Sequence, residues 1–471
     1  MTLRFQAFRA QSISWLTLAM LCAACGPADD DASAGTGATS GVGATAGAGA
    51  MAGMGGVAGG GAGGVGGDDC IDCKTYECDE GSWHEDVWHP CQLWSECGTD
   101  EVPLNVPDEY TDRVCARVEF VDQFGTADRD DATSVAANPD GTLCVAGKRY
   151  DSPKASAKPV GGFTRKYAAD GALVWASEFS GDGAEVTDVA ISSAGDCYSL
   201  GLTNQPDAAA GEWFVRKHGT DGSAEWSATG SSEAHAPQQL ETDPSGNVFA
   251  SFLTRSPLAF SAPHQAELMK FDATGALSWS TAVGSTGQDN AFLALIADEA
   301  VVVRSTPFEP ADYDPDATTV HATRLTTDGA VSWERGYPSS EINNVVDVVG
   351  TPDGNVIVAG FDTAQSATSR SIAYTLDPSG NGTSIELGDW SLRMLRVGAD
   401  GLLWTQERDT LSKWTSSGDL LDWLELGYTV FVRDFEPIPG YLVLVGYPHQ
   451  LLAGQTELGG GDAFLLKLRI D

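Results

Sequence analysis

Short runs in which apolar and polar residues alternate fill the chain from Val118 to Asp471, and a turn bounds each run. The first unit has four such runs, at residues 132–137, 143–146, 162–167 and 173–179. Alternation with a period of two predicts β-strands with one buried face. Turns that end in Gly141 and Gly171 follow the first and third runs, and glycine supplies the positive φ that such turns need. The pattern predicts a four-stranded antiparallel unit.

This unit recurs along the chain. In four places a turn glycine stands four residues before a tryptophan, at Gly171 and Trp175, Gly222 and Trp226, Gly275 and Trp279, and Gly329 and Trp333. The turn after the first strand also recurs, with glycines at positions 141, 195, 246, 354, 401 and 440, and it degenerates to Asp298-Glu299-Ala300 in the fourth unit. Seven units of four antiparallel strands predict an all-β protein with a seven-bladed β-propeller.

The two ends of the repeat region predict how the ring closes. The chain finishes with residues 463–470, which match the third strand of a unit, so the last unit lacks its fourth strand. Residues 118–125 precede the first full unit and match a fourth strand. We expect this N-terminal strand to complete the last blade, because closure protects strand edges that would otherwise pair with other chains.

Residues 118–471 resemble the bacterial β-propeller repeat family known as SBBP. The resemblance is carried by Gln123-Phe124-Gly125-Thr126, by residues 163–167 and 170–175, and by residues 354–360. It implies a secreted or surface-exposed propeller, in a family with no common enzymatic activity. Two enzyme patterns do not fit, since the turns differ from the tryptophan-docking motif of quinoprotein dehydrogenases and from the Asp-box of sialidases.

Two kinds of side chain are expected to lie between neighbouring blades. The recurring tryptophans are predicted to pack there, and they are Trp175, Trp226, Trp279, Trp333 and Trp423. Cys144 and Cys197 stand in the second strands of the first two units, where adjacent blades bring their faces together. The spacing leaves open a disulfide or two buried free thiols.

The N-terminus has the features of an export signal over residues 1–24. Arg4 and Arg9 precede an apolar run that is too short to span a membrane. Residues 21–26, Leu-Cys-Ala-Ala-Cys-Gly, resemble a bacterial lipobox, although Cys22 stands where the motif prefers Leu, Val or Ile. The resemblance implies cleavage before Cys25 and lipidation of its thiol. Ordinary secretory cleavage after Ala24 is the alternative.

Two segments separate the signal from the repeats. Residues 25–69 are rich in Gly and Ala and are predicted to be a disordered tether. Residues 70–117 hold Cys70, Cys73, Cys78, Cys91, Cys97 and Cys115, which in an exported chain predict a small disulfide-rich module. Fifteen pairings are possible, and a zinc site at the first two cysteines is the alternative. Residues 91–115 resemble the cysteine-rich repeats of tumour necrosis factor receptors, which implies a spacer or a binding knob.

The chain has 66 acidic and 27 basic residues and a formal charge of -39. This charge disfavours nucleic acid and anionic membrane surfaces, and it favours a soluble monomer that meets the membrane only through a lipid anchor. Asp312, Asp314 and Asp316 alternate in a long loop and are candidate calcium ligands, with a solvated acidic loop as the alternative. We expect no other cofactor.

Residues at one register of the inner strands, seven positions before the turn glycines, are expected near the central channel, where they face water or a small ligand. They are Ser134, Asp188, Gln239, Asp347, Met394 and Arg433. No nucleophile, metal-protease or phosphate-loop motif occurs, and no catalytic residue can be assigned.

These observations predict a lipoprotein on the outer membrane or cell surface, with a secreted protein as the alternative. Its propeller would be a non-catalytic binding or structural module for an extracellular protein or glycan. The long loops at residues 151–160, 256–265 and 307–319 are expected to share the binding face. The alternative is a hydrolase or polysaccharide lyase with its site at the channel mouth.

Overall fold

A computed structural model gives the fold of the chain. It describes residues 115–470 apart from residues 155–156, 182, 204–210, 232–234, 255–263, 289, 306–317, 339–341, 343, 363–369, 389–391, 409, 427–429, 449–451, 453–454 and 456–460. Before residue 115 it describes residues 82–83, 92–93, 96–98 and 101–103. The signal segment, the tether, Cys25, Cys70, Cys73, Cys78 and Cys91 lie outside the described residues, as do Asp312, Asp314 and Asp316.

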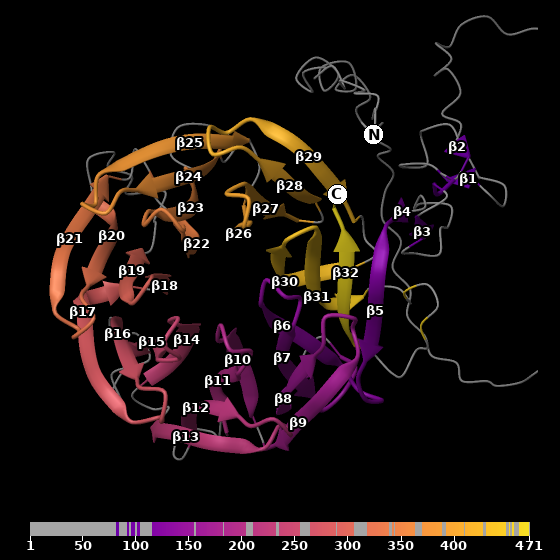
Figure 1. Ribbon diagram of the computed structural model, residues 1–471, viewed down its shortest axis with the longest axis horizontal. Coiled ribbons are helices and arrows are strands. Elements are labelled where there is room, and N and C mark those ends of the chain that lie inside the picture. Colours follow the sequence, from indigo (N-terminus) through magenta and orange to yellow (C-terminus); the bar gives the residue numbers. More distant parts are fainter. Residues whose placement is uncertain are drawn as a thin grey trace, which may run out of the picture. The chain divides into compact units, whose positions relative to one another are not determined.

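Seven antiparallel sheets of four strands follow one another round a ring, which confirms the predicted seven-bladed propeller (Figure 1). Blades 1 to 3 are β6 (Asp130–Ala137), β7 (Leu143–Tyr150), β8 (Pro159–Tyr167) and β9 (Leu173–Ser180); β10 (Glu185–Ile191), β11 (Cys197–Leu202), β12 (Glu212–His218) and β13 (Ala224–Ser231); and β14 (His235–Thr242), β15 (Val248–Thr254), β16 (His264–Phe271) and β17 (Leu277–Gln288).

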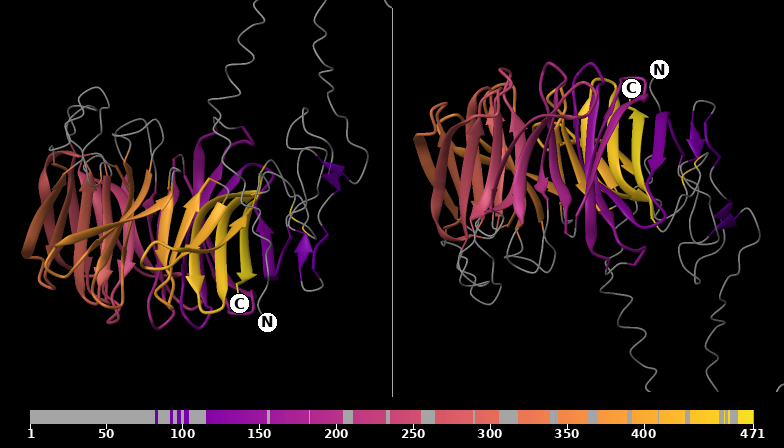
Figure 2. Two further views of the ribbon diagram at one scale, coloured as in Figure 1. Left: turned by 90° about the horizontal axis from the view of Figure 1, so that it is seen from above. Right: turned by 90° about the horizontal axis from the view of Figure 1, so that it is seen from below.

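Blades 4 to 6 continue the same order, with the first strand of each blade innermost and the fourth outermost in the ring of Figure 1. Their strands are β18 (Asn290–Ile296), β19 (Glu299–Ser305), β20 (Thr318–Leu325) and β21 (Val331–Pro338); β22 (Asn344–Gly350), β23 (Val356–Asp362), β24 (Arg370–Leu376) and β25 (Gly382–Gly388); and β26 (Met394–Val397), β27 (Leu403–Glu407), β28 (Thr410–Trp414) and β29 (Leu420–Glu425). The blades stand side by side when the ring is seen edge-on (Figure 2).

Blade 7 joins the two ends of the repeat region, as predicted. It consists of β30 (Val430–Ile438), β31 (Tyr441–Pro448), β32 (Ala463–Arg469) and the N-terminal strand β5 (Val118–Phe124), in that order. β32 and β5 pair antiparallel, and Phe464 lies opposite Gln123. The backbone N–H of Arg469 donates to the carbonyl of Arg117 at 2.8 Å. The ring is therefore closed by hydrogen bonds between the first and last strands of the repeat region.

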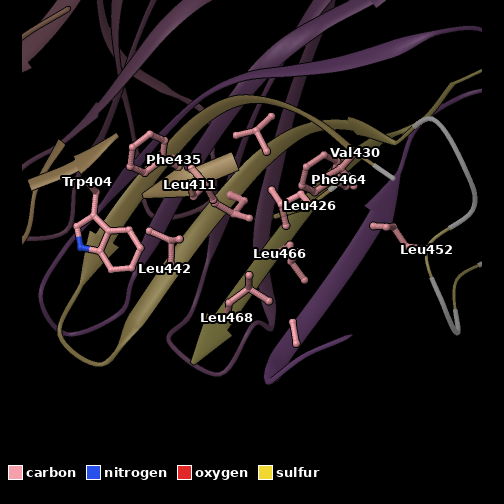
Figure 3. Close-up of a cluster of buried hydrophobic side chains, with 13 residues drawn as sticks. Trp404, Leu411, Leu426, Val430, Phe435, Leu442, Leu452, Phe464, Leu466 and Leu468 are labelled. Atoms are coloured by element: carbon pink, nitrogen blue, oxygen red, sulfur yellow. The ribbon is translucent and has the colours of Figure 1, made fainter. Parts of the chain in front are cut away.

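A hydrophobic cluster fills the seam between blades 6 and 7 (Figure 3). Leu411 and Leu426 come from blade 6, and Phe435, Leu442 and Phe464 come from blade 7; four of these five are fully buried. Ala116, which lies just before β5, belongs to the same cluster. Burial of apolar side chains, at about 25 cal/mol for each Å², therefore supports the closure together with the backbone pairing.

Little of the N-terminal module is described. β1 (Ser82–Trp83) pairs with β2 (Gln92–Leu93), and β3 (Val102–Pro103) pairs with β4 (Cys115–Ala116). A disulfide joins Cys97 to Cys115, with 5.3 Å between their Cα atoms. Within the part of the chain that the structure describes, no helix is long and apolar enough to cross a bilayer.

A second disulfide joins Cys144 in β7 to Cys197 in β11, with 5.9 Å between the Cα atoms. Both residues are buried in a cluster shared by blades 1 and 2. Of the two possibilities that the sequence leaves open, the structure has the disulfide. It ties two neighbouring blades together covalently.

The turn glycines lie against an aromatic ring of the preceding blade. Gly222, Gly275 and Gly329 have positive φ, and a Cβ added to each would come within 2.8 Å, 2.5 Å and 2.6 Å of Trp175, Trp226 and Trp279. Gly380 covers Trp333 in the same way, at 3.2 Å from its ring atoms. At the closing seam, Gly171 packs on Phe120 of β5 instead of on a tryptophan. The predicted packing is confirmed for these four tryptophans.

The predicted packing between blades is wrong for Trp423, whose side chain is 55% exposed. It stands five residues after its turn glycine, Gly418, where the other four tryptophans stand four residues after theirs. A shift of one residue in a strand turns the side chain to the opposite face. Asp422 takes the position that tryptophan has in blades 1 to 4.

Candidate functional site

A cavity of about 510 Å³ lies inside the ring, lined by residues from the inner strand of every blade. These strands are β6, β10, β14, β18, β22, β26 and β30. Five carboxyl groups and two guanidinium groups reach the cavity, from Asp188, Glu241, Asp347, Asp434, Glu436, Arg396 and Arg433. The cavity and its mouth were therefore considered as the candidate site.

A β-bulge shapes five of the seven inner strands. The register shifts just before Ser134, Asp188, Gln239, Asp347 and Asp434. Strands β18 and β26 have no such shift among their described pairs. Bulges redirect the side chains that follow them. Here each bulge comes before a polar side chain, whereas the two regular strands have Phe292 and Met394 at the equivalent position.

Each polar side chain after a bulge accepts a hydrogen bond from the backbone of the next blade. Asp188 accepts from the N–H of Leu240 at 2.7 Å, and Gln239 accepts from that of Leu293 at 2.6 Å. The same bond runs to Ser134 from Val189 (3.3 Å), to Asp347 from Leu395 (3.0 Å) and to Asp434 from Val135 (2.9 Å). A buried backbone N–H needs such a partner. This register therefore holds blades together, and its atoms are engaged before any ligand arrives.

The structure corrects the predicted member of this register in blade 7. The turn at Gly440 is one residue shorter than the others, so Asp434 takes the position assigned to Arg433. Arg433 is the bulged residue, and its guanidinium lies near Asp131, with 3.5 Å between Nη2 and the carboxylate. The residue seven positions before the turn glycine is therefore not the member of this register in blade 7, where the turn is shorter.

Arg396 is the cation of the channel. Its Nη1 bonds to Asp347, its Nη2 lies 2.6 Å from Asp434, and its Nε lies 3.7 Å from Glu436. Although burial works against its charge, the attraction of these carboxylates raises the pKa of Arg396. Arg396 thus links blades 5, 6 and 7 from inside.

The channel still has more carboxyl groups than cations. Burial among protein groups and the nearby acids raise the pKa of Glu241 and of Glu436 to about 8, and burial raises that of Asp188 to about 6. Glu241 touches the water of the cavity, but protein surrounds that water, so its carboxylate is less well hydrated than at an outer surface. The raised pKa values shift both glutamic acids toward the protonated form near neutral pH.

A row of alternating guanidinium groups and aromatic rings, which we call the arginine ladder, crosses the ends of blades 6, 7 and 1. From Arg393, the row passes Phe431, Arg433, Tyr447, Arg129 and Tyr150. Successive separations from guanidinium carbon to ring centre are 5.2, 4.9, 5.5, 5.1 and 4.5 Å. The rings of Phe431 and Tyr447 are nearly parallel, 12° apart. All these separations lie within the range of cation–π attraction.

Asp131 is the acid of the ladder and is completely buried. Arg129 donates to both of its oxygens, at 3.0 Å and 2.7 Å, and the hydroxyl of Tyr150 donates at 3.1 Å. Burial and the charge of Asp131 raise the pKa of Tyr150 to about 12, so this hydroxyl stays a donor. The ladder could not be read from the sequence, because its residues come from five separate strands and loops.

Among the described residues, Ser199 and His218 resemble a nucleophile with its base. The Oγ of Ser199 lies 2.8 Å from Nε2 of His218, and Nδ1 of His218 lies 3.2 Å from the carbonyl of Gly222. Both residues are buried, and Trp175 stacks on the imidazole at 5.1 Å. Burial lowers the pKa of His218 to about 4. With a carbonyl in place of an orienting carboxylate, and with no exposure, the pair is part of the core.

The predicted binding loops and calcium ligands lie partly or wholly outside the described residues. In the first predicted binding loop, residues 151–154 and 157–160 are described. Residues 256–263 of the second predicted loop and 307–317 of the third lie outside the described residues. Among the described side chains, no group of three or more His, Cys, Asp or Glu is arranged to hold a metal ion. The predicted calcium ligands lie outside the described residues.

No family model and no curated protein matches the chain. Among solved structures, it is similar to the β-propeller domain of Cps50 (Swd1) from Myceliophteria thermophila, with 14% identity and a TM-score of 0.45 over 75% of this chain and 100% of that one. It is also similar to the propeller domain of the Trilobed protease of Pyrococcus furiosus, with 12% identity and a TM-score of 0.46 over 73% and 96%. A protein of unknown function from Bacteroides caccae is 13% identical, with a TM-score of 0.34 over 61% and 94%. At these identities the likeness concerns the fold alone.

Proposed function

We propose that this chain is an exported lipoprotein whose propeller is a non-catalytic module that binds an extracellular glycan or protein. The observation that carries the proposal is how the polar atoms are used. The carboxylates and amides next to the channel hold neighbouring blades together, while the arginine ladder keeps donor groups at the mouth. A rigid ring with a few free donors at one place is suited to binding.

The way the channel acids are engaged within the protein supports a binding role. Acid–base catalysis needs an ionised and a protonated group that both reach a substrate. Asp347 and Asp434 are tied to Arg396 and to backbone N–H groups, and His218 is closed off in the core. The pKa values of Glu241 and Glu436 are raised to about 8, which makes both poor general bases near neutral pH.

The proposed localisation, through a lipid anchor, rests on the sequence. Cys25 follows an apolar segment and precedes a tether rich in Gly and Ala, an arrangement that would hold a propeller away from a membrane. Labelling of cells with radioactive palmitate should mark the protein and leave a Cys25→Ala variant unmarked. An unmarked native protein would contradict the anchor.

A glycan array, together with a screen for hydrolase and lyase activity on the same purified chain, tests the molecular function. We expect binding to a restricted set of glycans and no cleavage of them. Turnover of any bound glycan would contradict a non-catalytic module. Absence of binding across the array would direct the search to protein partners, by cross-linking on intact cells.

A further inference from the structure

We propose that the arginine ladder binds a single carboxylate group, carried by an acidic sugar or by a small carboxylic acid. This proposal rests on the proposed binding function and names the chemistry of its ligand. The ladder combines β30 and β31 of blade 7 with the starts of the inner strands of blades 6 and 1, which are neighbours in the ring (Figure 1). The site is thus built across the two seams that flank the closing blade.

Stacking fixes the guanidinium groups of the ladder. Phe431 lies 5.2 Å and 4.9 Å from the guanidinium carbons of Arg393 and Arg433, and Tyr447 lies 5.5 Å and 5.1 Å from those of Arg433 and Arg129, while the two rings stack on each other at 5.1 Å. A guanidinium held on a ring keeps its N–H edge free for an anion. Little side-chain entropy is then lost when the anion binds.

Two arginines of the ladder keep unused donors. Arg129 is already committed to both oxygens of Asp131. Arg433 lies 3.5 Å from Asp131, and its buried Nε has no hydrogen-bond partner. The exposed guanidinium of Arg393 forms no ion pair or hydrogen bond with any described residue. Arg129 and Arg433 face one buried carboxylate, and Arg393 adds a third guanidinium, so the row itself carries more positive than negative charge in a chain whose net charge is -39.

The outer N–H groups of Arg433 and Arg393 can be reached from solvent, unlike the buried Nε of Arg433. The side chain of Arg433 is 36% exposed and reaches the lining of the cavity, and Arg393 is exposed. An uncompensated donor that solvent can reach gains more from a charged acceptor than from water, since charge-assisted hydrogen bonds are about twice as strong as neutral ones. The ladder therefore offers the outer N–H groups of Arg393 and Arg433 to an anionic group.

Charge and shape select a carboxylate on a small carrier. A planar carboxylate matches the fork of a guanidinium and accepts two parallel N–H bonds. A polyanion would be repelled by the acidic chain as a whole, whereas one charge costs little to bring in. Neutral sugars usually bind by stacking on aromatic faces, but guanidinium groups already cover Phe431 and Tyr447.

Calorimetric titration of the full chain at pH 7 tests the proposal with glucuronate, glucose and N-acetylglycine. We expect glucuronate to bind at least roughly tenfold more tightly than glucose, because only glucuronate offers charge-assisted bonds. N-acetylglycine distinguishes the carriers. Binding equal to that of glucuronate would mean that the carboxylate alone is recognised, and weaker binding would mean that the sugar also contributes. Equal binding of glucuronate and glucose would overturn the proposal.

Variants localise the site. Arg433→Gln and Arg393→Gln should each weaken glucuronate binding about tenfold, the loss expected for one charge-assisted bond. Arg433→Lys keeps the charge but lacks the fork, and should also weaken binding. Arg335→Gln is the matched control, because this exposed arginine lies on the outer strand β21, away from the ladder.

Thermal melting of each variant checks folding, and Arg393, being exposed, can be replaced without disturbing the core. Unchanged affinity in both Arg393→Gln and Arg433→Gln would overturn the proposal. Binding of neutral glycans on the array with no binding of glucuronate would remove the carboxylate site and leave the binding module in place. The two proposals can thus fail separately.

Discussion

Burial moves the titration of His218 far from that of a histidine in water. The imidazole lies between Trp175 and the turn at Gly222 and accepts or donates only within the protein. Its pKa falls from 6.5 to about 4 because the charged form is poorly solvated there. The unfolded chain therefore binds a proton between about pH 6.5 and pH 4 that the folded chain does not bind.

His218 should thus make the protein less stable as the pH falls through this window. The difference corresponds to about 3 kcal/mol once both pKa values are passed. Denaturant unfolding of the native chain and of His218→Gln, from pH 7 to pH 4, should show the native chain losing stability relative to the variant. A parallel pH dependence of the two proteins would contradict the assigned burial.

Trp279 and Trp423 stand at different distances from their turn glycines. Comparing them tests whether this distance decides if a tryptophan packs between two blades. Trp279 lies under Gly329 and donates from Nε1 to the carbonyl of Thr327 at 2.9 Å, while Trp423 is 55% exposed. We expect Trp279→Ala to lower the free energy of unfolding by about 2 kcal/mol, through lost packing. Trp423→Ala should change it by less than about 0.5 kcal/mol. Equal effects, measured by urea denaturation, would contradict the seam assignment.

In the inner strands, the β-bulge decides whether a polar side chain bonds to the backbone of the next blade. In five inner strands it turns a polar side chain toward the N–H of the next blade, and in β18 and β26 neither the bulge nor the polar residue is present. The sequence shows the polar residues but not the bulges. These residues line the cavity as predicted, but the sequence does not show that their polar atoms are bonded to the next blade.

Adjacent glutamines in β14 give a matched test of this difference. Gln239 accepts from the N–H of Leu293, whereas Gln238 donates only to the nearby carbonyls of Ala236 and Pro237. Gln239→Leu should cost about 1–3 kcal/mol, because it leaves a backbone donor unsatisfied. Gln238→Leu should cost less than about 1 kcal/mol, since channel water can replace its bonds. Thermal and urea unfolding of both variants would show the ranking, and a reversed ranking would contradict it.

For the whole molecule, the crowding of acids in the channel makes stability depend on pH in the opposite sense to His218. The raised pKa values of Glu241 and Glu436, about 8 each, mean that the folded chain keeps protons that the unfolded chain releases above about pH 4.5. The resulting stabilisation is complete below that pH and is lost as the pH rises through 8.

Neutral replacements should remove this dependence. We expect Glu436→Gln and Glu241→Gln to melt at higher temperature than the native chain at pH 9 and to differ less from it at pH 5. Glu225→Gln, in the outer strand β13, is the control and should melt like the native chain at both values. If the channel variants melted below the native chain at pH 9, the raised pKa values of the two glutamates would be contradicted.

The ring itself could be predicted because its signals are local and repeated. Strand alternation and glycine turns recur along the repeat region, and its last unit lacks a fourth strand. β5 supplies that strand and completes blade 7, as expected. The arginine ladder could not be predicted, because Arg129, Arg393, Arg433 and Tyr447 are far apart in the chain and meet only when the ring closes. Trp423 failed for a smaller reason, a shift of one residue relative to its turn.

The most direct test of the binding site is a crystal structure of the full chain with glucuronate. We predict the carboxylate within hydrogen-bond distance of the guanidinium groups of Arg393 and Arg433, with the channel atoms of Asp188, Asp347 and Asp434 still bonded to the next blade. Glucuronate bound against Glu241 and Glu436 inside the channel, or absent from the ladder at saturating concentration, would contradict it.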